Sequence, residues 1–218
     1  MERMAERHRA AGEVPTLLLH SCCGPCSTSV MERLTEYFKV TVFYYNPNIY
    51  PEEEYAHRVA EQERLISLFP QVHPISFLAG EYDPQEFYEI ARGYENLPEG
   101  GERCFRCYEL RLRKTAQMAA AGSFDYFTTT LTVSPLKNAQ KLNEIGEKVA
   151  EEIGGTAWLL SDFKKKNGYL RSCELSREFG MYRQDYCGCV YSLRRDHVGL
   201  NHHRTESSED VPAVKTDS

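Results

Sequence analysis

The run Thr16-Leu17-Leu18-Leu19-His20 is followed directly by Ser21-Cys22-Cys23-Gly24-Pro25-Cys26. The first five residues form a short apolar run that ends in turn residues, which predicts a buried β-strand. Pro25 suits the first turn of a helix, so we expect a helix from Pro25 to about Phe38. The three cysteines therefore lie where a buried strand passes into a helix.

The rest of the chain continues this alternation. Further strands are expected at residues 40–45, 72–78, 124–130 and 157–160, and further helices at 52–69, 83–92, 104–121 and 138–153. Strands that alternate with helices predict an α/β fold with an open, mostly parallel, doubly wound sheet. Ligands of such sheets bind beyond the carboxyl ends of the strands, which is where the Cys22-Cys23 turn is expected. After Phe163 the alternation stops, and a basic, cysteine-bearing C-terminal segment is expected to cap the site.

The length of 218 residues suits one full-sized domain. We expect a flexible N-terminal arm at residues 1–13, a single α/β catalytic domain at 14–198, and a disordered tail at 199–218. The tail is polar and aperiodic, as is typical of disordered segments.

The composition is typical of a globular protein, with 41% apolar and 27% charged residues. No run approaches the roughly 20 apolar residues of a membrane span, and the mixed-charge N-terminus does not resemble a secretory signal. A cytoplasmic protein with no membrane partner is therefore expected. Thiols stay reduced in the cytoplasm, so its eight cysteines are more readily explained as metal ligands or redox-active thiols than as structural disulfides.

The charge is distributed unevenly. The net charge of −6 argues mildly against a nucleic-acid partner, but residues 51–102 alone hold 12 acidic and 3 basic side chains. Residues 103–114 hold 5 basic side chains and 1 acidic one, and residues 164–195 hold 8 and 3. Both basic stretches contain cysteines, so a polyanion could be drawn to the thiol-bearing face. Solvated surface charges are an equally good explanation of the pattern.

Five cysteines indicate one metal centre: Cys22, Cys23, Cys26, Cys104 and Cys107. Cys104 and Cys107 are three residues apart at the start of an expected helix, so both project from one face. Thiolates suit iron–sulfur clusters, zinc and copper(I). The pairs Cys23/Cys26 and Cys104/Cys107 also have the spacing of a four-cysteine zinc site, but that site would leave Cys22 unexplained. The spacing favours an iron–sulfur centre and leaves zinc open.

Two further cysteines lie in Tyr186-Cys187-Gly188-Cys189. A disulfide between them closes a very small, strained ring, and strained disulfides are oxidising and labile. They are a candidate reversible dithiol, although two more ligands or two inert thiols are alternatives. Cys173 is expected to be a buried small apolar residue, and His20 a packed or hydrogen-bonded histidine rather than a ligand.

Taken together, these segments resemble the cobalamin-independent epoxyqueuosine reductases of tRNA modification. The resemblance covers residues 16 to 195 in order, and its matching motifs are Leu18-Leu-His-Ser-Cys-Cys-Gly-Pro-Cys-Ser27, Phe43-Tyr-Tyr-Asn-Pro-Asn-Ile-Tyr-Pro51, Arg103-Cys-Phe-Arg-Cys-Tyr-Glu-Leu-Arg-Leu112, Thr129-Thr-Leu-Thr-Val-Ser-Pro-Leu-Lys-Asn138, Phe163-Lys-Lys-Lys-Asn-Gly-Tyr-Leu-Arg-Ser172 and Met181-Tyr-Arg-Gln-Asp-Tyr-Cys-Gly-Cys189.

The resemblance implies an activity and a cofactor. The family reduces the epoxide of epoxyqueuosine, at the wobble position of tRNA anticodons, to the cyclopentene of queuosine. It uses a [4Fe–4S] cluster, an adjacent mononuclear iron in some members, and no cobalamin. The matching cluster ligands are Cys22, Cys23, Cys104 and Cys107. Cys26 stands where some members have Asp, so it is a possible ligand of the accessory iron.

The resemblance also implies a redox-active disulfide between Cys187 and Cys189, and a fold similar to the adenine-nucleotide α-hydrolase-like group. Such a reaction consumes two electrons and two protons, so an electron donor is an expected partner. Tyr45, Tyr182 and Asp185 are candidate proton donors because of their positions in the matching motifs. The residues expected to hold tRNA phosphates are Lys164, Lys165, Lys166, Arg171 and Arg183.

Two other classes of protein remain open from the residues alone. A zinc-stabilised RNA-binding module would account for the cysteines and the basic stretches but has no need of Cys187 and Cys189. A thiol–disulfide oxidoreductase would account for that pair but leaves the other clustered cysteines without a role.

Overall fold

A computed structural model describes residues 2–193, and a five-stranded parallel sheet lies at its centre. The strands are β1 (Thr16–His20), β2 (Lys39–Tyr44), β3 (Ser76–Ala79), β4 (Tyr126–Thr129) and β5 (Ala157–Trp158), in the spatial order β3-β2-β1-β4-β5. Leu18 at the middle of β1 pairs with Thr41 on one side and Phe127 on the other. The three leucines of β1 are fully buried because helices cover both faces of the sheet.

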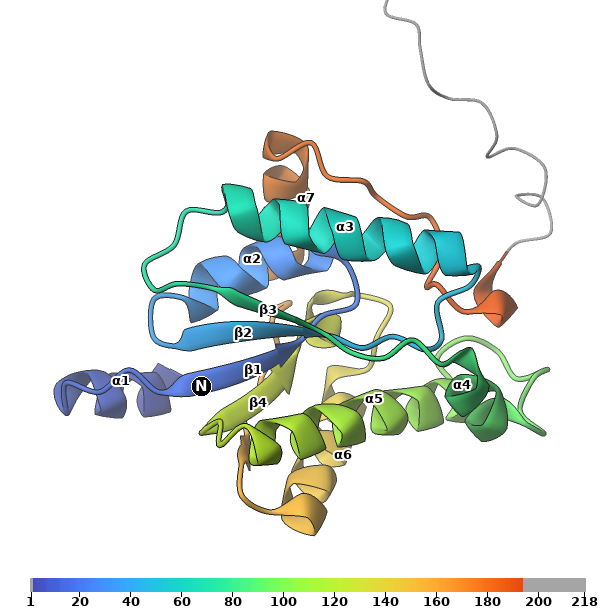
Figure 1. The fold of residues 1–218 in the computed structure, drawn as a ribbon, viewed down its shortest axis with the longest axis horizontal. Helices are drawn as coiled ribbons and strands as arrows, with labels where there is room; N and C mark the ends of the chain where they lie inside the picture. Colours follow the sequence, from blue (N-terminus) through green and yellow to red (C-terminus); the bar gives the residue numbers. More distant parts are fainter. Residues whose placement is uncertain (1, 194–218) are drawn as a thin grey trace, which may run out of the picture.

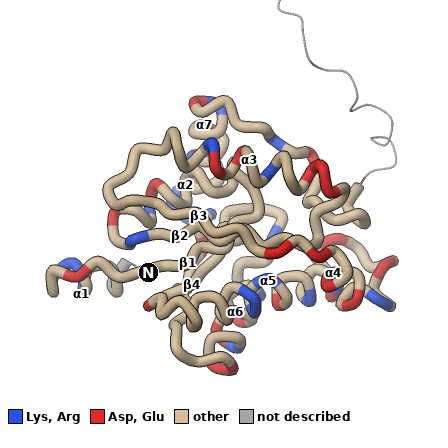
Figure 2. Tube along the Cα trace, in the orientation of Figure 1, with Lys and Arg blue, Asp and Glu red and all other residues tan. Residues whose placement is uncertain are grey.

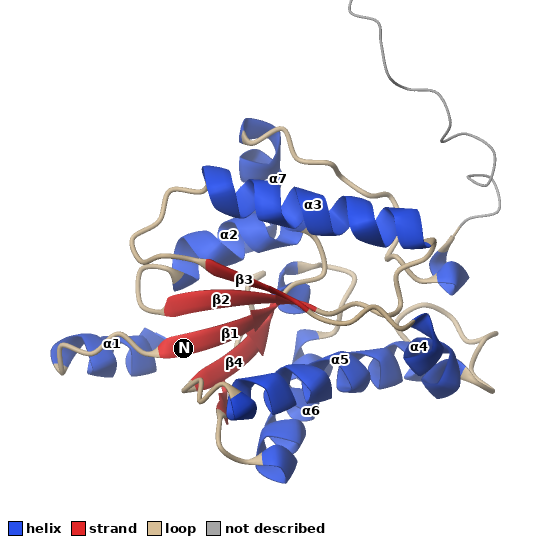
Figure 3. Ribbon diagram, in the orientation of Figure 1, coloured by secondary structure: helices blue, strands red, loops and turns tan. Residues whose placement is uncertain are grey.

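Helices form one layer on each face of the sheet (Figures 1 and 3). One layer holds α2 (Gly24–Leu34), α3 (Glu52–Leu68) and α7 (Gly168–Glu178), and the other holds α4 (Pro84–Ala91), α5 (Glu102–Ala121) and α6 (Ala139–Ile153). Each layer packs on its own apolar core, one containing Leu17 and Leu19 and the other Leu18 and Phe127. The chain after β3 crosses to the other side of β1, so the order of strands reverses between β1 and β4. The expected doubly wound α/β fold is confirmed, and every strand pair is parallel.

The elements expected from apolar patterning are all present, with shifted ends. β1 has the expected bounds, whereas β3 begins at Ser76 instead of residue 72. The difference arises because Val72 is 67% exposed and Pro74 cannot donate a ladder hydrogen bond. Among the described residues no strand follows β5, but the segment after Phe163 contains a helix that was not expected, α7, which packs against α2.

The N-terminal residues form a short helix, α1 (Glu2–Ala10). Met4 packs against the core, and a ring nitrogen of His8 lies 3.0 Å from the hydroxyl of Tyr126. Within residues 2–193, no helix is long and apolar enough to cross a membrane. The expected tail at 199–218 and residues 194–198 of the expected domain lie outside the described residues, and the domain boundaries stay a prediction.

Candidate functional site

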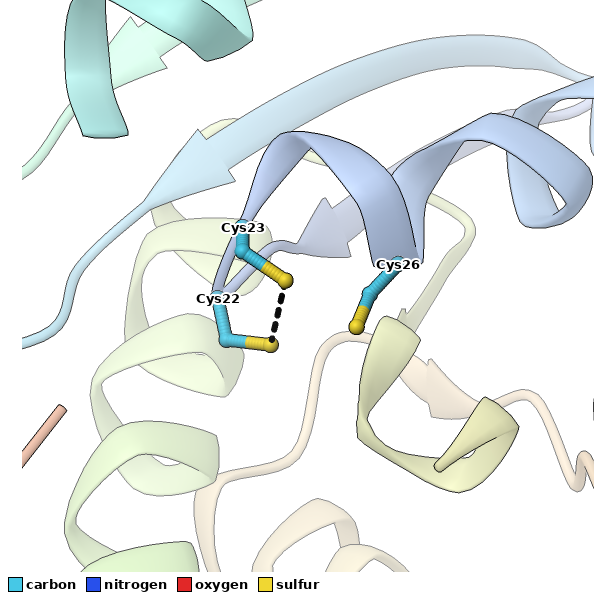
Figure 4. Close-up of side chains that lie close together, drawn as sticks. All are labelled: Cys22, Cys23 and Cys26. Carbon is cyan, nitrogen blue, oxygen red and sulfur yellow. Dashed lines mark hydrogen bonds between the residues drawn. The ribbon is translucent and has the colours of Figure 1, made fainter. Parts of the chain in front are cut away.

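Three thiols converge just beyond the carboxyl end of β1 (Figure 4). Cys22 and Cys23 form the turn after the strand, and Cys26 lies in the first turn of α2. The sulfur atoms of all three lie within 4.8 Å of one another, and the Sγ atoms of Cys22 and Cys23 are 3.8 Å apart. Cys23 is the N-cap of α2 and has no side-chain capping bond. The free N–H groups and the dipole of this helix end favour thiolates here.

Buried hydrogen bonds fix the turn that carries these thiols. The amide Nδ2 of Asn46 donates to the carbonyl of Ser21 at 2.8 Å, and the hydroxyl of Tyr44 donates to the carbonyl of Cys22 at 3.2 Å. The Ser21 and Ser27 hydroxyls both bond to Oε1 of Gln62, which lies on α3. The turn is therefore held by β2 and α3 as well as by its own strand.

The three thiols differ in how readily each loses its proton. Hydrogen bonds from Cys23 and then Cys26 hold the pKa of Cys22 well below its usual range. The same contact with Cys22 raises the pKa of Cys23 to about 12, and the pKa of Cys26 is also well above its ordinary value. Cys22 is thus the thiol of this group that most readily becomes a thiolate, the form that binds metals.

Cys104 and Cys107 lie in the first two turns of α5, whose N-terminus lies at the same end of the sheet (Figure 1). The N–H of Gly100 donates to Sγ of Cys104 at 3.2 Å. Cys22 packs against the apolar cluster that contains Cys104, whereas Cys107 packs with Cys189. Burial raises the pKa of Cys107 to about 12, with Cys187, Cys189 and Cys104 close enough to contribute. Only Cys22, Cys23 and Cys26 form a compact three-thiol group among residues 2–193.

Arg111 is a buried cation that lies close to several of these cysteines. It lies one turn after Cys107 on α5 and is 2% exposed. Its guanidinium donates to the carbonyl of Cys107 at 3.3 Å and to Oδ1 of Asn46 at 3.2 Å. Among the described residues no carboxylate lies within 4.0 Å of it. Burial works to lower the pKa of Arg111, but the nearby thiols of Cys107, Cys187 and Cys22 raise it above its ordinary value.

A buried cation without a carboxylate partner requires another source of negative charge, because an uncompensated buried charge costs several kcal/mol. The groups around Arg111 that can supply it are thiols. A thiolate-rich metal centre would provide the missing charge. The donor set and the electrostatics therefore fit a metal bound through sulfur, and zinc and iron–sulfur chemistry both use such ligands.

The segment after α7 returns to this end of the sheet and brings Cys187 and Cys189 with it. The N–H of Tyr50 donates to the carbonyl of Gly188 at 2.8 Å, and the hydroxyl of Tyr186 donates to the carbonyl of Tyr50 at 2.5 Å. Cys189 is 7% exposed and Cys187 is more accessible. All eight cysteines are free thiols in the structure.

Lys137 is a second cation of the site. It follows a short 3-10 turn (Thr130–Val133) after β4, and its Nζ lies 3.2 Å from Sγ of Cys187. Its nearest described carboxylate is Glu99, at 3.9 Å. Sequence reasoning did not single out Lys137 or Arg111 as site residues. The signal for Arg111 was present, since four residues after Cys107 is the same helix face.

Two other expectations for single residues had different outcomes. His20 is fully buried and bonds to Thr129 Oγ1 at 2.9 Å and to the carbonyl of Tyr45 at 3.1 Å, which confirms a hydrogen-bonded role. Burial lowers the pKa of His20 to about 3, so the ring is neutral. Cys173, expected to be buried, is partly exposed on α7 and lies beside Arg183.

The basic residues expected to hold tRNA have unequal access to solvent. Nζ of Lys164 bonds to the carbonyls of Thr132 and Lys137, and Arg171 forms a bidentate pair with Glu32 at 2.6 and 2.9 Å. Lys165 and Lys166 are exposed and line a surface cavity of about 390 Å³, and Arg183 is also exposed.

The expected proton donors are also partly engaged. The hydroxyl of Tyr45 donates to the Glu86 carboxylate, and that of Tyr182 donates to the Glu54 carboxylate at 3.0 Å. Burial raises the pKa of Tyr182 to about 12. Each tyrosine hydroxyl is thus hydrogen-bonded to a carboxylate, and Asp185 is exposed.

Acidic side chains occur along α3 and around α4 (Figure 2). The acidic stretch predicted from composition therefore borders the end of the sheet where the thiols gather. The two cations beside the thiols, Arg111 and Lys137, are largely buried.

Comparison with known proteins agrees with this site. A family model described as "Epoxyqueuosine reductase QueH" matches residues 17–195. An epoxyqueuosine reductase QueH of Streptococcus pyogenes serotype M1 is 43% identical over 202 residues, which cover 92% of this chain and 79% of the relative. Those of Staphylococcus epidermidis and Thermotoga maritima are 41% and 37% identical over 86% and 87% of this chain, and over 80% and 97% of the relatives. The chain belongs to the epoxyqueuosine reductase QueH family.

Proposed function

We propose that this chain reduces the epoxide of epoxyqueuosine in tRNA to the alkene of queuosine. The observation that carries the proposal is the convergence of Cys22, Cys23 and Cys26 beyond β1 in a chain of this family. The buried charge of Arg111 supports it, since it calls for an anionic centre at that place.

We propose Cys22, Cys23, Cys104 and Cys107 as the ligands of a [4Fe–4S] cluster. Cys22 and Cys23 lie at the N-terminus of α2, and Cys104 and Cys107 lie in the first two turns of α5, where the helix dipole favours negative charge most strongly near its start. Cys26 shares the turn with Cys22 and Cys23 and is the proposed ligand of an adjacent mononuclear iron. When bound, the cluster supplies electrons singly and the adjacent iron acts as a Lewis acid toward the epoxide oxygen.

The dithiol of Cys187 and Cys189 matches the demand of the reaction. Removing the epoxide oxygen as water consumes two electrons and two protons. Oxidation of two thiols to one disulfide releases two electrons and two protons, so one turnover oxidises the pair once. An external electron donor then restores the thiols. Tyr45, Tyr182 and Asp185 are the proposed carriers of protons to the departing oxygen.

We propose tRNA as the partner, bound foremost through Lys165, Lys166 and Arg183. These three side chains are exposed to solvent, whereas Lys164 and Arg171 are less exposed. Each lost phosphate contact should lower the slope of log affinity against log salt by about 1. Lys165→Ala should show this loss, and Arg171→Ala should show less. Since its substrate is tRNA, we propose the cytoplasm as its location.

The deciding experiment measures metal and product on the same protein. The chain is reconstituted anaerobically with iron and sulfide, its iron, sulfide and zinc are quantified, and it is incubated with a reductant and epoxyqueuosine-containing tRNA. Nucleosides are then analysed by mass spectrometry. We expect bound iron and conversion to queuosine. Cys22→Ser and Cys104→Ser should lose both, and Cys173→Ser, on α7 and outside the group of three thiols, should retain both.

Three outcomes distinguish the alternatives. Stoichiometric zinc with tRNA binding and no conversion would identify a zinc-stabilised RNA-binding module. Catalysed disulfide exchange without metal or conversion would identify a thiol–disulfide oxidoreductase. Conversion that survives Cys22→Ser would refute the assignment of the metal ligands while leaving the activity in place.

A further inference from the structure

The two thiols of the dithiol pair have different surroundings. Cys189 is 7% exposed and packs in an apolar cluster with Phe87 and Ala91. Its one polar side-chain contact among the described residues is the hydroxyl of Ser192, at 3.6 Å. The Cys189 sulfur is therefore the less accessible of the two.

Cys187 is partly exposed and faces a cation. Nζ of Lys137 lies 3.2 Å from its sulfur. Lys137 has a side chain only 11% exposed, and its carboxylate neighbour Glu99 is more distant, at 3.9 Å. Burial works to lower the pKa of Lys137, but the thiol of Cys187 raises it above its ordinary value, so the ammonium persists. The closest negative charge available to this ammonium is a thiolate at Cys187.

Backbone contacts hold both partners in place. The carbonyl of Lys137 accepts a bond from Lys164 Nζ at 3.2 Å, and its N–H donates to Ser134. On the other side, the carbonyl of Gly188 accepts from the N–H of Tyr50. The contact between Lys137 and Cys187 thus joins two anchored segments, which favours a persistent interaction over a chance approach of two mobile side chains.

Other groups face Cys187 as well. Arg111 is a second cation within electrostatic reach, and Tyr108 and Cys107 are the neighbouring titratable groups on α5. The Tyr108 phenol is neutral at neutral pH because burial raises its pKa to about 12. The charged group in direct contact with the Cys187 sulfur is the Lys137 ammonium, and the Glu99 carboxylate lies 3.9 Å from that ammonium.

We propose that the pair is asymmetric, with Cys187 as the thiol that exchanges with an external thiol reductant, Cys189 as the buried thiol that leaves when the disulfide opens, and Lys137 as the positioning residue that stabilises negative charge on Cys187. This inference rests on the proposed redox role of the pair. It assigns the reductant to the class of thiols, and it gives a role to a lysine outside the cysteine motifs.

The exchange proceeds in two balanced steps. The thiolate of the reductant attacks Sγ of Cys187, the Cys187–Cys189 bond breaks, and Cys189 leaves and takes up a proton. A second thiolate attacks the reductant sulfur of the mixed disulfide, and Cys187 leaves as a thiolate beside Lys137. Two reductant thiols are oxidised to one disulfide and the protein gains their two electrons; Cys189 takes up one proton, and the other passes to solvent because Cys187 stays a thiolate. Attack at Cys187 is favoured because Cys189 is the less accessible sulfur.

The first test measures alkylation of each thiol in the iron-loaded full chain. The reduced protein is treated with iodoacetamide at neutral pH, and modified peptides are quantified over time by mass spectrometry. Cys187 should react faster than Cys189. Lys137→Met should slow Cys187 about tenfold or more, as expected for loss of a charge-assisted hydrogen bond, and Lys137→Arg should restore most of the rate. The rate at Cys173 is the internal control and should not change.

The second test traps the mixed disulfide and does not depend on the lysine variant folding well. Cys189→Ser and Cys187→Ser are each incubated with oxidised glutathione, and the adduct is located by mass spectrometry. The adduct should form readily at Cys187 and much more slowly at Cys189. Faster reaction at Cys189, or a Cys187 rate unaffected by Lys137→Met, overturns the asymmetry. If the parent protein shows this difference between Cys187 and Cys189 but does not reduce epoxyqueuosine, the proposed function is wrong and the asymmetry of the pair still holds.

Discussion

Substituting Arg111 with Met tests whether this buried arginine serves the metal centre or the stability of the fold. Arg111 is 2% exposed and has no carboxylate within 4.0 Å among the described residues. A buried charge without such a partner costs several kcal/mol. Methionine fills much of the same volume and removes that cost.

The magnitude follows from what the substitution removes. Two hydrogen bonds are lost, to the carbonyl of Cys107 and to Oδ1 of Asn46, at about 1 kcal/mol each. Asn46 is fully buried, so its orphaned oxygen adds roughly 1–3 kcal/mol. Removing the buried charge also removes its desolvation cost of several kcal/mol, and this gain offsets the losses. The free energy of unfolding of the metal-free chain should therefore change by less than about 2 kcal/mol in either direction.

Arg58→Met is the matched control. Arg58 is also 2% exposed, but its Nε lies 2.7 Å from Oε1 of Glu54, whose side chain is 14% exposed. Breaking a buried pair leaves an uncompensated carboxylate and costs about 3–5 kcal/mol. For a chain of this size, each kcal/mol lowers Tm by about 2–4 °C, so Arg58→Met should unfold roughly 10 °C below the parent and Arg111→Met close to it.

The assay has two readouts. Urea unfolding of the metal-free, reduced chain gives the stability, and iron per chain after anaerobic reconstitution gives the affinity for the centre. Arg111→Met should lose much of its iron, and Arg113→Met, two residues further along α5 and paired with Glu109 and Glu152, should keep it. Equal destabilisation by Arg111→Met and Arg58→Met would show that Arg111 is already compensated without metal. Full iron retention by Arg111→Met would refute its role at the centre.

Three further changes probe the fold. A Cβ at Gly146 would lie 2.3 Å from Cε2 of Trp158. Gly146→Ala should therefore lower the free energy of unfolding by about 1–3 kcal/mol through overpacking, despite its better helix propensity. The same loss in a Trp158→Leu background would contradict this cause. Gly188 has φ +115°, so Gly188→Ala should strain the loop by roughly 1–3 kcal/mol. The strain should weaken the bond from the Tyr50 N–H to the Gly188 carbonyl and speed hydrogen exchange at the Tyr50 amide. An unchanged exchange rate would contradict this prediction. Hydrogen bonds from the start of β1 hold the pKa of Asp125 below its usual range. Its stabilisation is thus complete above about pH 4 and is lost as pH falls through the lowered pKa, so Asp125→Asn should flatten the acid limb of the stability curve.

The sheet was predictable where burial alone decides the structure. β1 was expected at its observed bounds because three leucines between turn residues have few other solutions. Helix α7 was missed because its buried positions are mostly small or polar, including Gly168, Ser172 and Ser176. A helix that packs through small residues leaves little apolar periodicity in the sequence.

The site was predictable where its residues are neighbours in the chain. Cys22, Cys23 and Cys26 lie within one turn, so their convergence follows from local geometry. Lys137 is 50 residues from Cys187 along the chain, and no spacing rule connects them. Their contact depends on where the segment after α7 returns to the sheet, which is a property of the whole fold.

Basic composition was a poor guide to which cations face outward. Lys164 bonds to two backbone carbonyls of the loop that carries Lys137, so part of the apparent tRNA-binding charge instead supports the position of an inner cation. Arg111 and Lys137 are both largely buried and face thiols rather than solvent. Surface cations are screened over about 10 Å at moderate salt, whereas buried ones are not. Salt should therefore weaken tRNA binding at Lys165 and Lys166 while leaving the electrostatics of the thiols largely unchanged. We therefore expect the two sets of positive charge to act separately, the exposed one on the phosphates of tRNA and the buried one on the thiols.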